Sequence, residues 1–248
     1  MLFTIGLVHG LNINNMKIET YCLANNEEKM MPYFMRHYTQ FSHVILLENG
    51  STDRTVEIAA SYGADIWKFD REDEINDQWF SDIKNTCWKE STADWVIICD
   101  ADEFIYHPNL VSILENTDST IFMPRLFNMF SENFPTTEGQ IYEEVTMGKE
   151  GGGKMNLFNP KEITDINFNH GCHKASPEGN VKLCVNSEII TMHFRFIGKE
   201  FTIERNIRAA SRLSSFNKEL GLGYHVIGTP EEITKNIEAE MLNLIKVI

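Results

Sequence analysis

The sequence predicts an α/β fold, in which helices flank a mostly parallel sheet. Short apolar runs alternate with amphipathic stretches, which is typical of parallel strands joined by helical crossovers. One run, Trp95–Cys99, has no polar alternation and therefore predicts a strand buried on both faces. It ends in Asp100-Ala101-Asp102-Glu103. Because ligands of open α/β sheets bind beyond such carboxyl ends, we expect a site there.

The elements before this central strand follow in order. Residues 17–24 predict a first strand, and Asn25 to Glu28 predict the start of a helix with acids in its first turn. We expect this helix to bury one face, made of Met30, Met31, Phe34, Met35 and Tyr38.

A second strand is predicted over residues 43–48. Gly50 then permits a tight turn, and residues 51–53 can cap a helix that runs to about Tyr62. Before the central strand we expect a strand over 64–69, an acidic loop over 70–77 and a helix over 78–91.

The pattern beyond the central strand is less regular. A short helix is expected over 108–115, a loop at Gly151–Gly153 and a helical segment over 199–218. Thr229 followed by Pro230 and two acids predicts a C-terminal helix over 229–247. Strand-like pieces lie at 120–130, 154–158 and 187–194. No repeat or linker is visible, so we expect an N-terminal extension over 1–15 and one domain over 16–248.

Composition disfavours some kinds of partner. The 248 residues can bury a sizeable core, and a net charge of −14 disfavours extended contact with nucleic acid or an anionic membrane. The five cysteines include no C-x-x-C pair, so we expect free thiols, no zinc site and a reducing compartment, the cytoplasm. No apolar run has transmembrane length, and no signal peptide is expected.

The carboxylates after the central strand can hold a metal ion. Asp100 and Asp102 are two residues apart, so in extended backbone their side chains leave the same face. Paired oxygen ligands suit Mn²⁺ or Mg²⁺, which usually keeps waters and a bridging diphosphate. The alternative is an acidic turn without a ligand.

Several motifs together resemble the family 2 glycosyltransferases. Asn26-Glu27-Glu28 resembles their N-E element, and Glu48-Asn49-Gly50-Ser51-Thr52-Asp53 is similar to their D-N-G-S-T-D turn. A branch of that superfamily shows the form D-W…D-x-D-E-F, found here from Asp94 to Phe104. Further likenesses are Phe134-Pro135, Lys154…Phe158-Asn159-Pro160, Gly171-Cys172-His173 and Met192-His193-Phe194.

The resemblance implies a GT-A fold with a nucleotide-sugar half over about 16–106 and an acceptor half over about 107–225. It implies a metal ion, Mn²⁺ or Mg²⁺, bound by Asp100, Asp102 and His193. Glu48 replaces the aspartate that usually contacts the base. The implied donor-binding residues are Ala24, Asn26, Glu27, Glu48, Asn49, Gly50, Asp53, Lys84, Asn85, Asp100, Ala101, Lys154 and Lys199.

An inverting transfer needs a base for the acceptor hydroxyl. The candidates are Asp165, His170, His173 and Glu178, and we choose His173 and then Asp165 as catalytic residues. A retaining mechanism would need no such base. Because Asp102 lies at a strand end rather than in the core, we expect Asp102→Ala to lose metal-dependent activity while the protein stays folded.

Three functions remain open. The first is transfer of a sugar from a nucleotide sugar, expected to be a UDP-sugar, to a hydroxyl of a glycan or another acceptor, a hydroxylated base in DNA included. The second is a nucleotidyltransferase or phosphohydrolase, which usually carries a glycine- and lysine-rich loop after the first strand. Here that position reads Ala24-Asn25-Asn26-Glu27. The third is an inactive carbohydrate-binding protein of the same fold.

Overall fold

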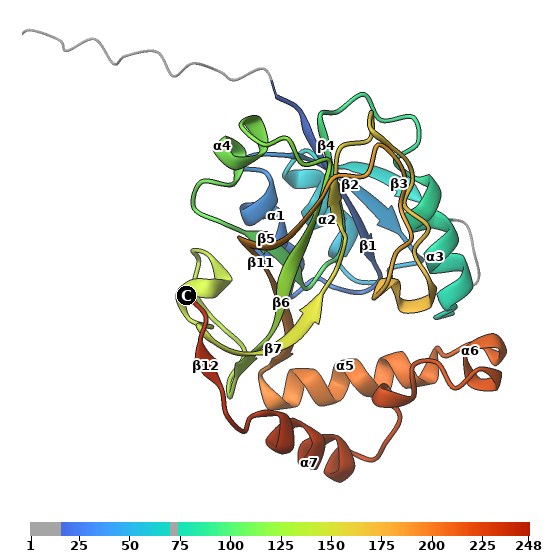
Figure 1. The fold of residues 1–248 in the computed structure, drawn as a ribbon. Coiled ribbons are helices and arrows are strands. Elements are labelled where there is room, and N and C mark those ends of the chain that lie inside the picture. Colours follow the sequence, from blue (N-terminus) through green and yellow to red (C-terminus); the bar gives the residue numbers. More distant parts are fainter. Residues whose placement is uncertain (1–15, 70–73) are drawn as a thin grey trace, which may run out of the picture.

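The structure is a computed structural model that describes residues 16–69 and 74–248. The expected N-terminal extension and residues 70–73 of the expected acidic loop lie outside the described residues. The described residues form a ten-stranded sheet with helices on both faces (Figure 1), which confirms the α/β prediction. A separate two-stranded sheet pairs β9 (Ile163–Asp165) with β10 (Glu178–Gly179).

Four parallel strands position the candidate site. They lie in the order β3 (Asp65–Lys68), β2 (His43–Glu48), β1 (Ile18–Ala24) and β4 (Trp95–Asp100). Since neighbouring pairs are all parallel, their carboxyl ends meet at one edge of the sheet.

These strands have a hydrophobic core on each face, because successive side chains of a strand point to opposite faces. Helices cover both cores. Cys22, Leu46 and Ile97 pack in the core that contains the side chains of α1 (Met31–Tyr38). The alternate strand residues pack with Trp88, just after α3 (Asp77–Thr86). The five apolar residues expected on the buried face of the first helix are all buried.

The second half of the chain extends the sheet. β11 (Leu183–Ile197) runs parallel to β6 (Ile121–Ser131) and antiparallel to β5 (Glu103–Tyr106). The remaining elements are α2 (Thr55–Ser61), α4 (Leu110–Glu115), β7 (Met147–Gly153), β8 (Leu157–Phe158), β12 (Ile245–Lys246) and the 3₁₀ turns η1 (Ile141–Glu143), η2 (His170–Cys172) and η3 (Tyr224–Val226).

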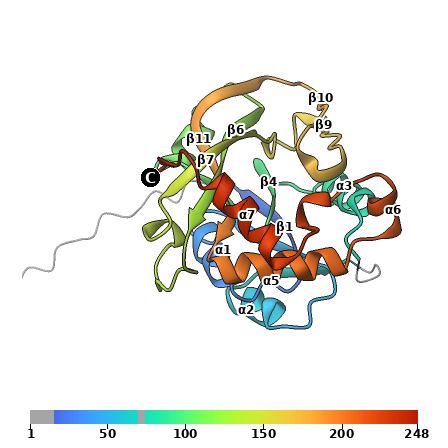
Figure 2. The ribbon, with the colours of Figure 1, turned by 90° about the horizontal axis from the view of Figure 1, so that it is seen from below.

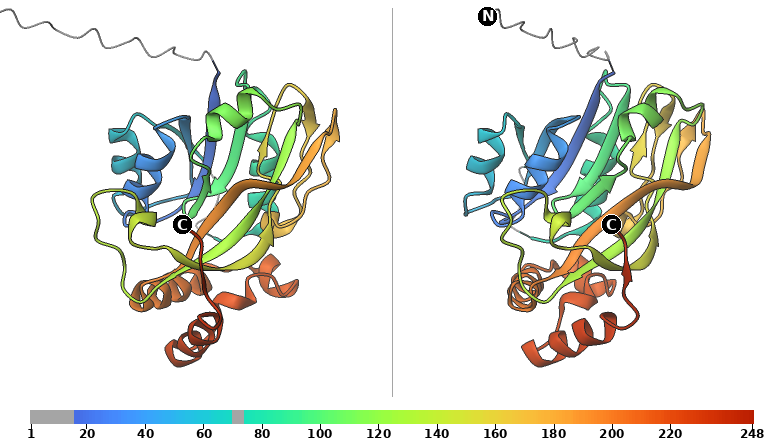
Figure 3. Two further views of the ribbon diagram at one scale, coloured as in Figure 1. Left: turned by 60° about the vertical axis from the view of Figure 1, so that its left-hand side comes forward. Right: turned by 90° about the vertical axis from the view of Figure 1, so that its left-hand side faces the viewer.

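Three C-terminal helices lie together on the side of the sheet that carries the site (Figures 2 and 3). They are α5 (Lys199–Ser211), α6 (Ser215–Glu219) and α7 (Pro230–Glu240). Gly198 joins β11 to α5 with φ of +69°, and a Cβ there would lie 2.6 Å from the backbone nitrogen of Phe134. Only glycine therefore fits this junction without strain.

Four expectations about element boundaries were wrong. The first helix begins at Met31 rather than near Glu28. Asn26 has φ of +53°, and the backbone N–H groups of the two residues after it donate to side chains of the turn that follows β2. Gly151–Gly153 belongs to β7, where a Cβ on Gly153 would lie 2.9 Å from the carbonyl oxygen of Pro124. The helical segment over 199–218 divides between α5 and α6, and the C-terminal helix ends at Glu240.

All five cysteines are free thiols. Among the described residues, none of the helices combines the length and the apolar character that crossing a membrane requires.

Candidate active site

A cavity of about 340 Å³ lies at the carboxyl ends of β1, β2 and β4. Its lining comes from these strand ends, the start of α3, the η2 turn, β11 and α5. The predicted site residues that line it are Ala24, Glu27, Asn49, Lys84, Asp100, Ala101, Asp102, Lys154, His173 and His193.

Lysines neutralise two of the carboxylates after the central strand. Lys84 of α3 places its Nζ atom 2.6 Å from Oδ1 of Asp100, and Lys154 forms an ion pair with the buried Glu103. Burial alone would raise the pKa of Asp100, but Lys84 and Lys154 outweigh it and lower that pKa. Asp100 is therefore ionised and turned toward α3.

Asp102 is turned to the other side. Its Oδ2 atom lies 3.2 Å from Nε2 of His193 and 2.7 Å from Nη1 of Arg205. Burial alone would raise the pKa of Asp102, but Arg205 and His193 hold it well below its usual range. The expectation that Asp100 and Asp102 share one face was wrong, because β4 ends at Asp100 and the chain turns at Ala101 and Asp102.

The orientation of the His193 ring is fixed from the next strand. Asn128 of β6 is its register partner, and Oδ1 of Asn128 lies 3.1 Å from Nδ1 of His193. With Asn128 oriented in this way, its amide oxygen only accepts, so Nδ1 carries a proton. Nε2 therefore faces Oδ2 of Asp102, so that either a proton or a metal ion can lie between these two atoms.

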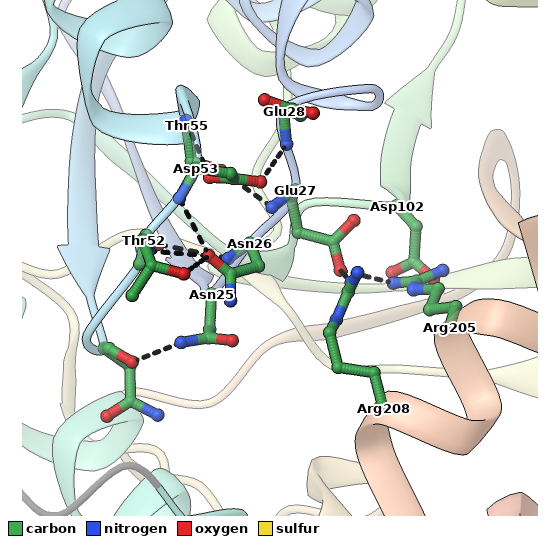
Figure 4. A network of polar contacts seen from close by, with 12 residues as sticks. Asn25, Asn26, Glu27, Glu28, Thr52, Asp53, Thr55, Asp102, Arg205 and Arg208 are labelled. Atoms are coloured by element: carbon green, nitrogen blue, oxygen red, sulfur yellow. Dashed lines mark hydrogen bonds and ion pairs between the residues drawn. The ribbon is translucent and has the colours of Figure 1, made fainter.

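Glu27 connects the end of β1 to α5 (Figure 4). Its Oε1 atom lies 3.2 Å from Nη2 of Arg205 and 3.8 Å from Nη2 of Arg208. Oε2 is buried and has no hydrogen-bond partner among the described residues. Burial raises the pKa of Glu27, although Arg205 opposes this.

Two motif residues hold loops together instead of lining the cavity (Figure 4). Oδ1 of Asn26 accepts hydrogen bonds from the backbone N–H groups of Thr52, at 2.7 Å, and Asp53, at 3.2 Å. The Asp53 carboxylate accepts from the backbone N–H groups of Glu28 and Thr55. These bonds fix the turn after β2 against the turn after β1.

The structure does not place Glu48 where the expected contact with the nucleobase would be made, but it does place its neighbour Asn49 there. Glu48 accepts a hydrogen bond from the backbone N–H of Ser51 and does not line the cavity, and neither does Gly50, which forms the turn with φ of +76°. Asn49 does line it, and both polar atoms of its buried amide have no partner among the described residues. Asn49 is therefore better placed than Glu48 to contact a nucleobase.

Other predicted residues lie outside the cavity lining. Asn85 exchanges two hydrogen bonds with the backbone of Phe168, and the Lys199 ammonium lies 3.5 Å from Glu238. Among the base candidates, Asp165 pairs with Lys89, His170 with Gln78, and Glu178 with Asn167. The structure does not bring these residues together with Asp102.

His173 is the base candidate that lines the cavity. Partial burial and the nearby Lys154 lower its pKa, so its imidazole is neutral at neutral pH. A neutral imidazole at this place can accept a proton.

The sequence did not identify the arginines of the cavity. Arg205 and Arg208 line it from α5, Arg212 lines it from the residue that caps the end of α5, and Arg195 lines it from β11. We call Arg195, Arg205 and Arg208 the arginine wall. Burial lowers the pKa of Arg195. The spacing of the α5 arginines was a signal for one shared face, but it could not tell which surface that face meets.

The predicted three-ligand metal site is not assembled. Within residues 16–69 and 74–248, no cluster of three or more histidine, cysteine or acidic side chains is placed to hold a metal ion. Asp102 and His193 are in contact, whereas Asp100 faces Lys84. Two protein ligands still fit Mg²⁺ or Mn²⁺, because these ions commonly take one or two carboxylates with waters and phosphate oxygens.

Solved structures that are similar to the chain include two synthases. Glucosyl-3-phosphoglycerate synthase from Mycobacterium tuberculosis, solved with Mn²⁺, UDP and glucosyl-3-phosphoglycerate, is 19% identical, with 46% of this chain and 44% of that chain covered and a TM-score of 0.34. Mannosyl-3-phosphoglycerate synthase from Rubrobacter xylanophilus is 12% identical, with coverages of 59% and 54% and a TM-score of 0.37.

The sequence also matches a curated protein and a family model. A TPR repeat-containing protein of Synechococcus elongatus is 32% identical over 82 residues, and the match covers 33% of this chain and 19% of that protein. The chain thus spans about a fifth of the curated relative it matches. The family model described as glycosyl transferase family 2 matches residues 25–176, more than half of the chain. The chain therefore belongs to glycosyl transferase family 2.

Proposed function

We propose that the protein transfers a sugar from a nucleotide-sugar donor to an acceptor hydroxyl, with inversion, and that a divalent cation assists. The contact between Asp102 and His193 carries this proposal, because it joins a carboxylate and an oriented imidazole 3.2 Å apart in a cavity at the strand ends. Mn²⁺ suits such a mixed ligand pair, and Mg²⁺ is the alternative. A bound cation would share Asp102 with Arg205 or displace Arg205.

The residues around this pair support each part of the transfer. The bound cation would neutralise the diphosphate as it leaves. Lys84 and Lys154 neutralise Asp100 and Glu103, so that these two carboxylates do not repel the donor diphosphate. The amide of Asn49 offers a donor and an acceptor to the edge of a base, which we expect to be uracil. His173 accepts the proton of the acceptor hydroxyl.

A thermal-shift panel tests the proposal. Nucleoside diphosphates and their sugars are each added with and without Mn²⁺, because a ligand that binds only the folded state raises the melting temperature. We expect a shift with a uridine diphosphate compound that requires Mn²⁺. Asp102→Asn should abolish this shift, and the matched variant Asp165→Asn, outside the cavity, should keep it.

Two results would contradict the proposal. A response to nucleoside triphosphates but to no diphosphate would favour the nucleotidyltransferase or phosphohydrolase alternative. A response to glycans alone would favour a carbohydrate-binding protein.

A further inference from the structure

The cavity has a charge opposite to that of the whole chain. The chain carries a net charge of −14, yet the cavity is lined by six basic side chains and five carboxylates. The carboxylates are Glu27, Asp77, Asp100, Asp102 and Glu103, and the basic residues are Lys84, Lys154, Arg195, Arg205, Arg208 and Arg212. The lining thus has one more basic group than it has carboxylates, whereas the whole chain is strongly acidic, so this cavity is where an anion meets the least repulsion.

Most of these basic groups already have a carboxylate. Lys84 pairs with Asp100, Lys154 with Glu103, and Arg205 with both Asp102 and Glu27. Arg195 differs, because no carboxylate oxygen of the described residues lies within 4.0 Å of its guanidinium. It is half-buried, so its charge is only partly compensated by water.

Packing holds the Arg195 side chain at the cavity. Its guanidinium lies 5.2 Å from the centre of the Phe196 ring, and that ring stacks on Phe130 at 4.7 Å. A contact with a ring face leaves guanidinium N–H groups free for another partner. Arg195 also follows His193 by two residues on β11, which places it beside the expected reaction centre.

The donor does not require this extra charge. In a nucleotide sugar each phosphate of the diphosphate carries one negative charge, and a divalent cation balances both. Lys84 of α3 pairs with Asp100, and Lys154, just after β7, pairs with Glu103; we place the donor diphosphate beside these two pairs. Arg195 lines the cavity from β11, together with α5, and is not needed to neutralise the donor.

We propose that Arg195 binds a carboxylate or phosphate group of the acceptor, so that the acceptor is an anionic hydroxyl compound such as a sugar acid or a sugar phosphate. Arg208, whose guanidinium is 3.8 Å from Glu27, is the second member of the arginine wall able to reach an anion. This inference rests on the proposed glycosyl transfer and adds the chemical class of the acceptor.

The test compares three acceptors with one carbon skeleton: glucose, glucuronate and glucose 6-phosphate. Release of nucleoside diphosphate from the donor is measured with each acceptor and with water alone, for the wild type, Arg195→Gln and Arg125→Gln. Arg125 is a control, because its guanidinium also lies 5.2 Å from a phenylalanine ring but is outside the cavity and pairs with Glu150 at 3.9 Å.

We expect the wild type and Arg125→Gln to prefer an anionic acceptor over glucose by about tenfold or more in kcat/KM, as a charged hydrogen bond would give. Arg195→Gln should lose this preference. The glucuronate and glucose 6-phosphate arms tell whether the anion is a carboxylate or a phosphate.

Three results would overturn the inference. Equal use of glucose and the anionic sugars by a wild type that hydrolyses the donor would refute it and leave glycosyl transfer standing. An equal loss by Arg195→Gln in every reaction, hydrolysis included, would assign Arg195 to the diphosphate instead. A wild type that turns over no nucleotide sugar at all would refute glycosyl transfer and the acceptor class with it.

Discussion

Arg205 and Asp102 are joined by an ion pair of 2.7 Å between Nη1 and Oδ2, and the same guanidinium reaches Glu27 at 3.2 Å. One side chain of α5 thus ties together the turns that follow β1 and β4. These carboxylates are almost fully buried, so their charges depend on Arg205 for compensation. The pair is both part of the candidate site and part of what holds α5 on the sheet.

Replacing Arg205 by Gln should lower the free energy of unfolding by about 3 kcal/mol or more, because two buried carboxylates lose their partner. Urea unfolding followed by circular dichroism measures this change. Arg208→Gln is the control, since Arg208 is more exposed and lies 3.8 Å from Glu27, so its loss should cost less than about 1 kcal/mol. Equal effects of the two substitutions would contradict the role given to Arg205.

Asp102→Asn should remove Mn²⁺ binding and also destabilise the protein. The expectation that a substitution of Asp102 spares the fold was based on its place at a strand end, but the side chain is buried against Arg205 and His193. We expect a loss of about 3 kcal/mol, with the protein still folded at 25 °C. Calorimetric titration with Mn²⁺ and nucleoside diphosphate measures binding, and retained Mn²⁺ affinity would exclude Asp102 as a ligand.

His173→Gln should lower kcat by about a hundredfold, as expected when a general base is removed. Asp165→Asn should change kcat less than twofold, because Asp165 pairs with Lys89 outside the cavity. Steady-state kinetics with a fixed acceptor decide between these candidates. If the effects were reversed, or if neither substitution slowed transfer, His173 would not be the base.

His37 should make stability depend on pH. It is a buried residue of α1, its Nε2–H donates to the carbonyl oxygen of Ile105 at 2.9 Å, and its Nδ1 has no partner among the described residues. Burial lowers the pKa of His37 to about 4. The unfolded chain takes up this proton near its ordinary pKa of about 6.5.

Between these two pKa values the unfolded state binds more protons than the folded state, so the free energy of unfolding falls as the pH is lowered from about 6.5 to about 4, by about 3 kcal/mol in all. Unfolding in urea at a series of pH values measures this slope. His37→Gln keeps a donor for Ile105 and cannot be protonated, so its slope should be smaller. Identical slopes for the two proteins would show that His37 does not titrate in this window.

The parallel half of the fold was predictable because its signals are local. An apolar run without alternation, such as Trp95–Cys99, has few alternatives to a strand buried on both faces. Gly151–Gly153 carries no such signal. Its place in β7 depends on close approach to the β6 backbone, which is a property of the partner strand and not of the segment.

The candidate site was predictable at the ends of strands and less so elsewhere. The D-x-D motif predicted correctly at which edge of the sheet the site lies. The alternation of side-chain direction along a strand does not hold where the chain turns after β4, so the sequence could not tell that Asp100 faces α3 and Asp102 faces β11. The ion pair between Arg205 and Asp102 joins residues 103 positions apart. No local pattern reports a contact of that range.

Gly198 does not line the cavity, but it influences where the cavity arginines of α5 lie. It sets the angle at which α5 leaves β11, and any side chain there would press on the backbone of Phe134. A substitution at Gly198 would change the angle between β11 and α5. Arg205 and Arg208 would move with the helix, whereas His193 on the strand would not. Changes in acceptor choice could therefore evolve at a residue that contacts neither substrate.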